Sequence, residues 1–219
     1  MRKTLQVTDG DRMLPVTIRN YDRDDFPGLI ALQAECFPPP FPSELWWNEE
    51  QLGEHVSRFP DGALCAEIEG RIVGSMTGLR IHMSEERKHD WASVTDDGCI
   101  RNHAADGETL YVVDICVSPA FRKFGIGKWL MQSMYETVVY LGCDRLLGGG
   151  RMPGYGALSA QLSPEQYLSQ VVEGAIHDPV ITFLLRCGRM PVGVIENYLE
   201  DEQSANYAAL MEWRNPFKS

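Results

Sequence analysis

The residues best suited to bind a ligand lie in one short turn, V-S-P-A-F-R-K-F-G-I-G-K, at positions 117–128. An apolar run precedes this turn and an apolar segment with helical spacing follows it, so the pattern predicts a strand, a turn and a helix. Gly125 and Gly127 have no Cβ atom and allow the backbone to approach a ligand closely. The free N–H groups at a helix start, together with the helix dipole, favour an anion. The turn is therefore predicted to bind a phosphate group.

Three basic residues of the turn, Arg122, Lys123 and Lys128, add positive charge to a chain whose formal net charge is −11. Two other phosphate-binding turns use similar parts but differ in spacing. A dinucleotide-binding turn requires G-x-G-x-x-G directly after the first strand of its unit. A Walker loop requires Ser or Thr after Gly-Lys, where this chain has Trp129. The turn fits neither of them.

The string V-x-P-x-x-R-x-x-G-x-G, placed between a strand and a helix, resembles the GCN5-related N-acetyltransferases (GNAT), a superfamily of acyl-CoA-dependent transferases. The alternative is an ordinary strand-to-helix turn with two chance glycines. The resemblance implies acetyl-CoA or another short acyl-CoA as co-substrate, with its pyrophosphate held by the turn. It also implies that the backbone of Ile115, Cys116 and Val117 pairs with the pantetheine arm. The implied cofactor-binding residues of the turn are Arg122, Lys123, Phe124, Gly125, Ile126, Gly127 and Lys128.

A single carboxylate, Asp114, interrupts the apolar run V-V-D-I-C that precedes the turn. An isolated buried charge is costly, so this side chain must be paired, face a cleft or be protonated. Burial would raise its pKa and make it a better proton acceptor near neutral pH. The family resemblance supports Asp114 as the catalytic base, and the alternative is a carboxylate that is hydrogen-bonded for structural reasons alone. Glu108, just before the strand, is the second candidate.

Candidates for the general acid and for substrate binding lie later in the chain. The resemblance implies a Tyr on the last helix as the acid, but Leu184 occupies that position, so Tyr155, Tyr198 or a water molecule would have to replace it. Arg151 and Tyr155 follow the next strand, where ligands collect in α/β sheets, and are the candidate substrate-binding residues. The alternative for both is a plain connecting loop.

The elements that must position these residues indicate one α/β (α+β) domain. Residues 1–13 are predicted to be a polar leader and residues 14–219 a single N-acetyltransferase domain. Glycine and proline are too frequent in residues 148–156 for regular structure. The resemblance implies a mixed, mostly antiparallel sheet of about seven strands flanked by helices. The predicted strands are 14–19, 63–68, 72–81, 109–117, 143–147, 192–195 and 207–213, and the predicted helices include 43–58, 126–141 and 163–176.

Residues 82–107 form a long polar connection that departs from the minimal plan of the superfamily. Connections of this length inside a domain are usually mobile or functional. Three segments, R-M-P-G-Y at 151–155, N-Y-L-E-D at 197–201 and W-R-N-P at 213–216, also resemble the acetyltransferase domain that occurs fused to nitrilase-type hydrolases. This narrower resemblance implies at most a nitrilase-type partner.

Composition limits the remaining classes of function. The chain has 219 residues, 44% of them hydrophobic, which is ordinary for one globular domain. Its acidity argues against nucleic acid and anionic membranes as partners and suits a cationic substrate, although it also serves solubility alone. The six cysteines and five histidines show no metal-ligand spacing, so no metal is expected. Scattered cysteines, no signal peptide and no apolar membrane span favour a cytoplasmic protein.

The sequence thus predicts an N-acetyltransferase that moves an acetyl group from acetyl-CoA to a primary amine by direct attack in a ternary complex. The amine is a small molecule or peptide, and a homodimer is possible. The alternative is a non-catalytic acyl-CoA-binding or regulatory module, or an accessory subunit of a nitrilase-type enzyme.

Overall fold

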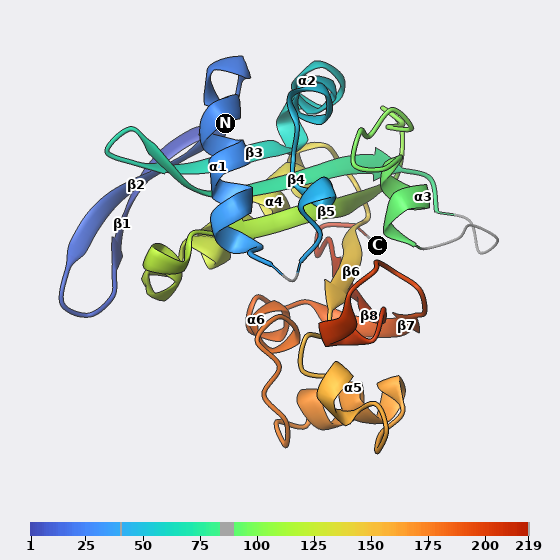
Figure 1. The fold of residues 1–219 in the computed structure, drawn as a ribbon. Coiled ribbons are helices and arrows are strands. Elements are labelled where there is room, and N and C mark those ends of the chain that lie inside the picture. The colour runs from blue at the N-terminus through green and yellow to red at the C-terminus, as the bar shows by residue number, and fades with distance from the viewer. Residues whose placement is uncertain (40, 84–89, 219) are drawn as a thin grey trace.

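The computed structural model describes residues 1–39, 41–83 and 90–218, and these residues form an eight-stranded sheet in the order β1-β2-β3-β4-β5-β6-β8-β7 (Figure 1). Neighbouring strands are antiparallel except β5 and β6, which are parallel. The predicted mixed, mostly antiparallel sheet is therefore confirmed, with one strand more than expected. The strands are β1 (Arg2–Thr8), β2 (Met13–Asn20), β3 (Ala63–Ile68), β4 (Arg71–Ile81), β5 (Thr109–Val117), β6 (Arg145–Arg151), β7 (Met190–Ile195) and β8 (Ala208–Arg214).

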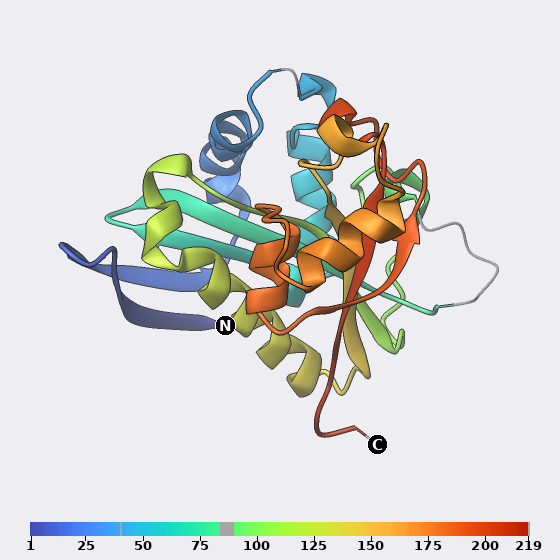
Figure 2. The same cartoon turned by 90° about the horizontal axis from the view of Figure 1, so that it is seen from below.

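Helices cover both faces of this sheet. The α-helices are α1 (Phe26–Cys36), α2 (Glu49–Arg58), α3 (Trp91–Thr95), α4 (Ile126–Tyr140), α5 (Pro164–Val172) and α6 (Ile181–Arg186). The described residues also contain the 3-10 helices η1 (Arg23–Asp25), η2 (Ser43–Leu45), η3 (Pro60–Gly62), η4 (Pro119–Phe124), η5 (Gly156–Leu158) and η6 (Glu202–Ser204). Figure 2 shows α1 and α2 on one side of the sheet and α4 on the other. The core fills the space between these layers.

The segment expected to be a polar leader is instead a strand. Residues 2–8 form β1, which pairs with β2 along its whole length. Its exposure alternates along the strand, and Val7 is buried on the inner side, so one face of β1 extends the core while the other meets solvent. The expectation was wrong because polar residues on an edge strand mask the alternation that marks a half-buried strand.

Glycine-rich residues after Leu147 also belong to a strand, where the sequence predicted irregular structure. β6 continues through Gly148, Gly149 and Gly150 to Arg151. A Cβ atom at Gly149 would lie 2.3 Å from the Tyr198 ring, and one at Gly150 would lie 2.7 Å from Leu184 on the opposite face. Large side chains therefore pack directly against the backbone on both sides of β6, and this close approach is why glycine is present.

The close contact at Gly149 predicts a large loss of stability on adding one methyl group. Gly149→Ala should lower the free energy of unfolding by about 1–3 kcal/mol, because the new Cβ overlaps the Tyr198 ring. Urea unfolding followed by circular dichroism measures this change. Gly193→Ala is the matched control: Gly193 also lies in a strand but has no atom within 4 Å of its Cβ position. Equal destabilisation by both variants would contradict the packing argument.

The predicted insertion, residues 82–107, contains more structure than its polar sequence indicates. Residues 84–89 lie outside the described residues. Beyond them, Asp90 caps the short helix α3, in which Trp91 and Val94 are buried. The Trp91 indole Nε1 donates a hydrogen bond to the carbonyl oxygen of Val113 at 3.0 Å. The insertion is thus attached to the central strand β5.

Candidate active site

The sheet opens between β5 and β6. These strands pair only from Thr109 to Tyr111 on β5 and from Arg145 to Leu147 on β6. Beyond this point β6 pairs with β8 and β5 pairs only with β4, and Figure 1 shows β6 turning away from β5. The backbone groups of residues 112–117 that point away from β4 are therefore free of sheet partners. An extended ligand can pair with that edge in the way a further strand would.

A β-bulge lies in the middle of the free edge. Thr77 on β4 is opposite Asp114, but the next residue, Gly78, is opposite Val112, so Val113 is the extra residue. Its carbonyl oxygen accepts the hydrogen bond from the Trp91 indole. The bulge places Asp114 and Cys116 on the sheet face that α1 covers, because both side chains contact Gln33 of that helix.

The predicted phosphate-binding turn has the geometry of an open helix start. Pro119–Phe124 form η4, Gly125 has a positive φ of 73°, and α4 begins at the next residue without a side-chain cap. A Cβ atom at Gly125 would meet no atom within 4 Å, so the backbone there is accessible. The side chains of Phe124 and Ile126 are buried and anchor the turn from below. Backbone N–H groups therefore remain for an anion, as a pyrophosphate requires.

The basic side chains of the turn surround this helix start. Arg122, Lys123 and Lys128 are all exposed. The Arg122 Nε donates to the carbonyl oxygen of Val117 at 3.2 Å, which ties the end of β5 to the turn. Gly127 lies against Phe183 of α6, with a Cβ position 3.1 Å from that ring. The turn and the free edge of β5 are thus continuous, so that one ligand with an anionic group and an extended arm can contact both.

Asp114 lies half-buried beside this free edge. The Gln33 amide Nε2 donates a hydrogen bond to its Oδ2 at 2.9 Å. Burial raises the pKa of Asp114 to about 6, although the hydrogen bond from Gln33 acts in the opposite direction. A carboxylate with this pKa is ionised at neutral pH and still binds a proton readily. Gln33 was not predicted from the sequence, although its position in an otherwise apolar stripe of α1, with Leu29, Leu32 and Cys36, is a detectable signal.

The structure separates the second candidate base from Asp114. Glu108 precedes β5, six residues before Asp114, a distance of about 20 Å along an extended strand. Its carboxylate accepts hydrogen bonds from the Met83 N–H and from His82. Burial pushes the pKa of Glu108 upward, but these hydrogen bonds outweigh it and leave the pKa below its ordinary value. This position favours Asp114 as the base.

Arg151 lies at the end of β6, on the other side of the opening. Its guanidinium forms an ion pair with Asp201 at 2.8 Å and stacks over the Phe41 ring, 5.1 Å from the ring centroid. Arg151 thus connects β6 with the loop between α1 and α2, and its side chain is only partly exposed. Because the guanidinium is already paired, we expect Arg151 to shape the acceptor side of the opening rather than to carry a free charge.

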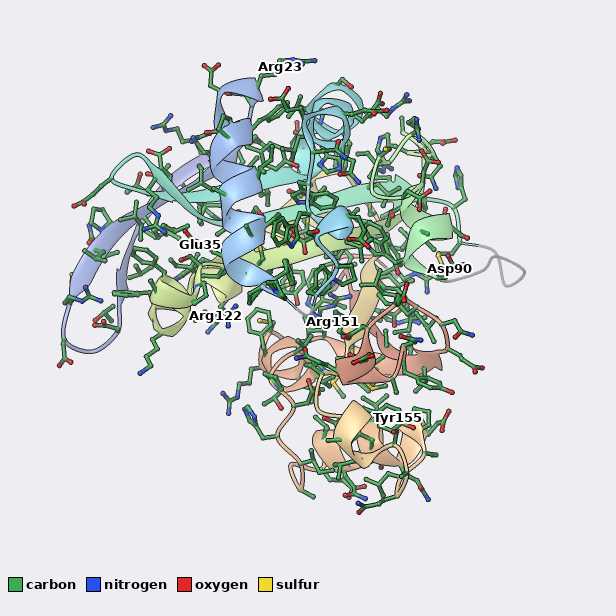
Figure 3. All side chains as sticks on the ribbon, viewed as in Figure 1. Arg23, Glu35, Asp90, Arg122, Arg151 and Tyr155 are labelled. Carbon is green, nitrogen blue, oxygen red and sulfur yellow. The ribbon has the colours of Figure 1, made fainter. Side chains whose placement is uncertain are left out.

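Tyr155, the other candidate substrate-binding residue, is buried in an aromatic cluster. Its ring contacts Tyr167 and Tyr207, and its hydroxyl donates to the carbonyl oxygen of Leu162. Figure 3 shows Tyr155 beside α5, apart from Arg122 and Arg151. The structure therefore brings Arg151 to the opening but gives Tyr155 a packing environment.

Helix α6 contains no tyrosine. Leu184, in the position expected for the general acid, packs against Gly150. Tyr198 is buried over β6, and its hydroxyl accepts a hydrogen bond from Tyr111 at 3.4 Å. Burial raises the pKa of Tyr198 well above its ordinary value, so it is a poor proton donor. Among the three expected substitutes, these positions favour a water molecule.

In the part of the chain that the structure describes, no group of three or more His, Cys, Asp or Glu side chains is arranged to hold a metal ion. Within the same residues, every helix is too short or too polar to cross a membrane.

Comparison with known proteins identifies relatives of the whole chain. Residues 26–151 match the acetyltransferase (GNAT) family. The uncharacterized N-acetyltransferase YkwB of Bacillus subtilis (strain 168) is 55% identical over 98% of this chain and 96% of its own length. The probable hydrolase YhcX of the same organism is 36% identical over 98% of this chain, which spans 41% of that longer protein. The expected likeness to a domain fused to hydrolases is thus partly supported.

Two solved structures share the fold along nearly the whole chain. The GphF GNAT-like decarboxylase in complex with isobutyryl-CoA has a TM-score of 0.72 at 25% identity, covering 90% of this chain and 98% of that one. The loading GNATL domain of CurA from Lyngbya majuscula has a TM-score of 0.77 at 19% identity, covering 93% of this chain and 99% of that one. The open, mostly antiparallel sheet is therefore the architecture that the sequence predicted.

Proposed function

Because the chain belongs to the GNAT family of acetyltransferases, we propose that it transfers an acetyl group from acetyl-CoA to a primary amine by direct attack in a ternary complex. The observation that carries this proposal is the position of Asp114, a proton acceptor beside the free edge of β5 and three residues before its end. The turn at Gly125 supports the same assignment, since it supplies backbone N–H groups for a pyrophosphate.

The proposed reaction requires one base and one oxyanion donor. Asp114 takes a proton from the ammonium group, and the neutral amine attacks the thioester carbon. A free backbone N–H of β5 stabilises the oxyanion that forms. The C–S bond then breaks, the thiolate leaves with the electron pair, and the nitrogen releases its second proton to water, so that a neutral amide remains. A thiol has a pKa of about 8.5, so water can supply the proton without a tyrosine acid.

A thiol-release assay tests this function directly. Acetyl-CoA is incubated with polyamines, amino acids, aminoglycosides and lysine peptides, and CoA affinity is measured in parallel by calorimetry. We expect turnover with a cationic acceptor, in line with the net charge of −11. Tight CoA binding without turnover on any amine would favour the non-catalytic module instead. Absence of CoA binding would overturn both assignments.

The likeness to the GphF decarboxylase, 25% identical over most of this chain, favours a second candidate function. This second candidate is decarboxylation of a malonyl-type thioester. The C–C bond to the carboxylate breaks and CO2 leaves, the electron pair of that bond forms the thioester enolate, and the α-carbon takes a proton. The protonated form of Asp114 would be a suitable donor near pH 6. Mass spectrometry of malonyl-CoA and methylmalonyl-CoA incubations distinguishes the two functions, because only decarboxylation shortens the acyl group without an amine.

A hydrolase partner is a further part of the proposal, and it rests on the longer relative YhcX. Co-purification of the chain from cells tests it. Recovery of a hydrolase subunit in constant ratio would support it, and recovery of the chain alone would refute it.

A further inference from the structure

A row of buried polar side chains runs across the α1-covered face of the sheet, next to Asp114. The Tyr21 hydroxyl lies 2.9 Å from His55 Nδ1 and 3.0 Å from Thr77 Oγ1. The other ring nitrogen, His55 Nε2, lies 2.6 Å from the carbonyl oxygen of Gly98. All three side chains are at most 3% exposed. These hydrogen bonds form a row, the Thr77–Gly98 chain, whose four members come from segments far apart in the sequence.

The direction of each hydrogen bond in the Thr77–Gly98 chain follows from its last member. A carbonyl oxygen only accepts, so His55 Nε2 carries the proton that it donates to Gly98. Burial lowers the pKa of His55 to about 4, so the ring is neutral and Nδ1 is an acceptor. Tyr21 must therefore donate to Nδ1. Because Tyr21 has one hydroxyl proton, its oxygen must accept from Thr77.

The first member of the chain, Thr77, stands directly opposite Asp114 in the β4–β5 pair. Cβ atoms of cross-strand partners usually lie about 4.5–5.5 Å apart. In the structure the Asp114 carboxyl group is hydrogen-bonded to Gln33 and has no hydrogen bond to Thr77, whose hydroxyl is bonded to Tyr21. The Thr77 proton is directed toward Tyr21, so only lone pairs of Oγ1 remain for Asp114. Lone pairs repel a carboxylate but accept a hydrogen bond from a carboxylic acid.

We propose that the Thr77–Gly98 chain positions Thr77 Oγ1 as the acceptor for the acid form of Asp114, so that the proton taken from the amine is held at Asp114. Thr77, Tyr21 and His55 are thus positioning residues, and their role rests on the proposed function of Asp114 as base. The chain also keeps the Thr77 proton from hydrogen-bonding the carboxylate, which would make Asp114 a weaker base.

Other groups face Asp114 from the elements packed against it. Gln33 of α1 donates to its carboxylate, and Cys36 and Cys116 are the nearest thiols, on α1 and β5. The hydrogen bond with Cys116 is the main cause of the lowered pKa of Cys36, and the positive charge of Arg122 lowers this pKa further. On β4 the neighbours of Thr77 on this face include Ser75, which has no charge. A Cys36→Ser variant therefore separates thiol titration from that of Asp114.

The test is the titration of Asp114 itself, followed by 13C NMR of protein labelled at aspartate carboxyl carbons. The Asp114 signal is the one missing from Asp114→Asn. In Tyr21→Phe the Thr77 proton is released and can donate to the carboxylate, so the pKa of Asp114 should fall by about one unit, a tenfold change in proton affinity. Tyr135→Phe is the matched control, since it removes a hydroxyl that donates to Cys187 on the other side of the molecule.

A second background makes the test specific. In Thr77→Val there is no hydroxyl for Tyr21 to direct, so adding Tyr21→Phe should produce no further shift. Thr77→Ser should retain the wild-type titration. Equal shifts of Tyr21→Phe in both backgrounds, or none in either, would overturn the proposal. Loss of packing alone would lower the melting temperature without this dependence on Thr77.

The outcomes separate this proposal from the proposed function. Suppose that the acidic limb of the pH–activity profile disappears in Asp114→Asn but the Asp114 titration is unchanged in Tyr21→Phe. The assignment of Asp114 as base then stands, and the proposed role of the Thr77–Gly98 chain is refuted. If the titration shifts as expected while Asp114→Asn retains full activity, the proposed role of the Thr77–Gly98 chain is supported and the assignment of Asp114 as base is refuted.

Discussion

Asp114→Asn is expected to lower kcat/KM for the cognate amine about 10²–10⁴-fold, the usual contribution of a positioned general base. The amide keeps the shape of the carboxyl group and can still accept a hydrogen bond from Gln33 but cannot take a proton. In the wild type, activity should fall below pH 6, where Asp114 becomes protonated. Thiol release measured from pH 5 to 9 should show this acidic limb in the wild type and not in the variant.

Glu108→Gln provides the matched control at the other end of the same strand. The glutamine oxygen can still accept from the Met83 N–H, so the local structure is preserved. Turnover and its pH dependence should then remain at the wild-type level. If Glu108→Gln lost as much activity as Asp114→Asn, the assignment of the base to Asp114 would fail.

Asp114→Asn is also expected to change the free energy of unfolding, and measuring that change shows whether the variant is folded. The pKa of Asp114 is about 6 in the folded chain against 3.8 for an unperturbed aspartate, so the folded state binds the proton more tightly. The resulting cost to the wild type is absent below pH 4 and complete above pH 6. The unfolding free energy of Asp114→Asn minus that of the wild type should therefore be up to about 3 kcal/mol larger at pH 8 than at pH 4, as urea unfolding at the two pH values would measure.

The part of the site that sequence could predict is the part made by neighbouring residues. The strand, turn and helix around Gly125 are encoded within residues 109–141, and the structure has them at those positions. The capping box of Ser163 and Gln166 likewise marks the start of α5. Such features depend on backbone conformation and local hydrogen bonds, which adjacent residues determine.

Features that depend on distant partners were missed. Gly149 belongs to a strand because it pairs with Leu210 of β8, and Tyr198, also far along the chain, packs against its backbone. The helix predicted from Ser43 begins at Glu49, because Asn48 forms the capping box with Gln51 while Ser43–Leu45 form a 3-10 turn. Gln33 and Thr77 are candidate site residues only because folding places them beside Asp114. No local spacing reports these contacts.

Gly125→Glu is expected to weaken CoA binding at least about 100-fold. The new carboxylate would stand at the open start of α4, where the pyrophosphate is proposed to bind, and two like charges at about 4 Å repel by several kcal/mol near a protein surface. The positive φ of Gly125 adds about 1–2 kcal/mol of strain for any side chain. Calorimetric titration with CoA measures the loss of affinity.

The strain and the charge are separated by a second glycine with the same local geometry. Gly174 follows α5, has a φ of 80° and, like Gly125, has no atom within 4 Å of its Cβ position. Gly174→Glu therefore introduces the same carboxylate and a similar strain away from the turn, and its CoA affinity should equal that of the wild type. Gly125→Ala should lose affinity only modestly, because it adds strain without charge. If Gly125→Glu bound CoA as tightly as Gly174→Glu does, the pyrophosphate could not lie at this helix start.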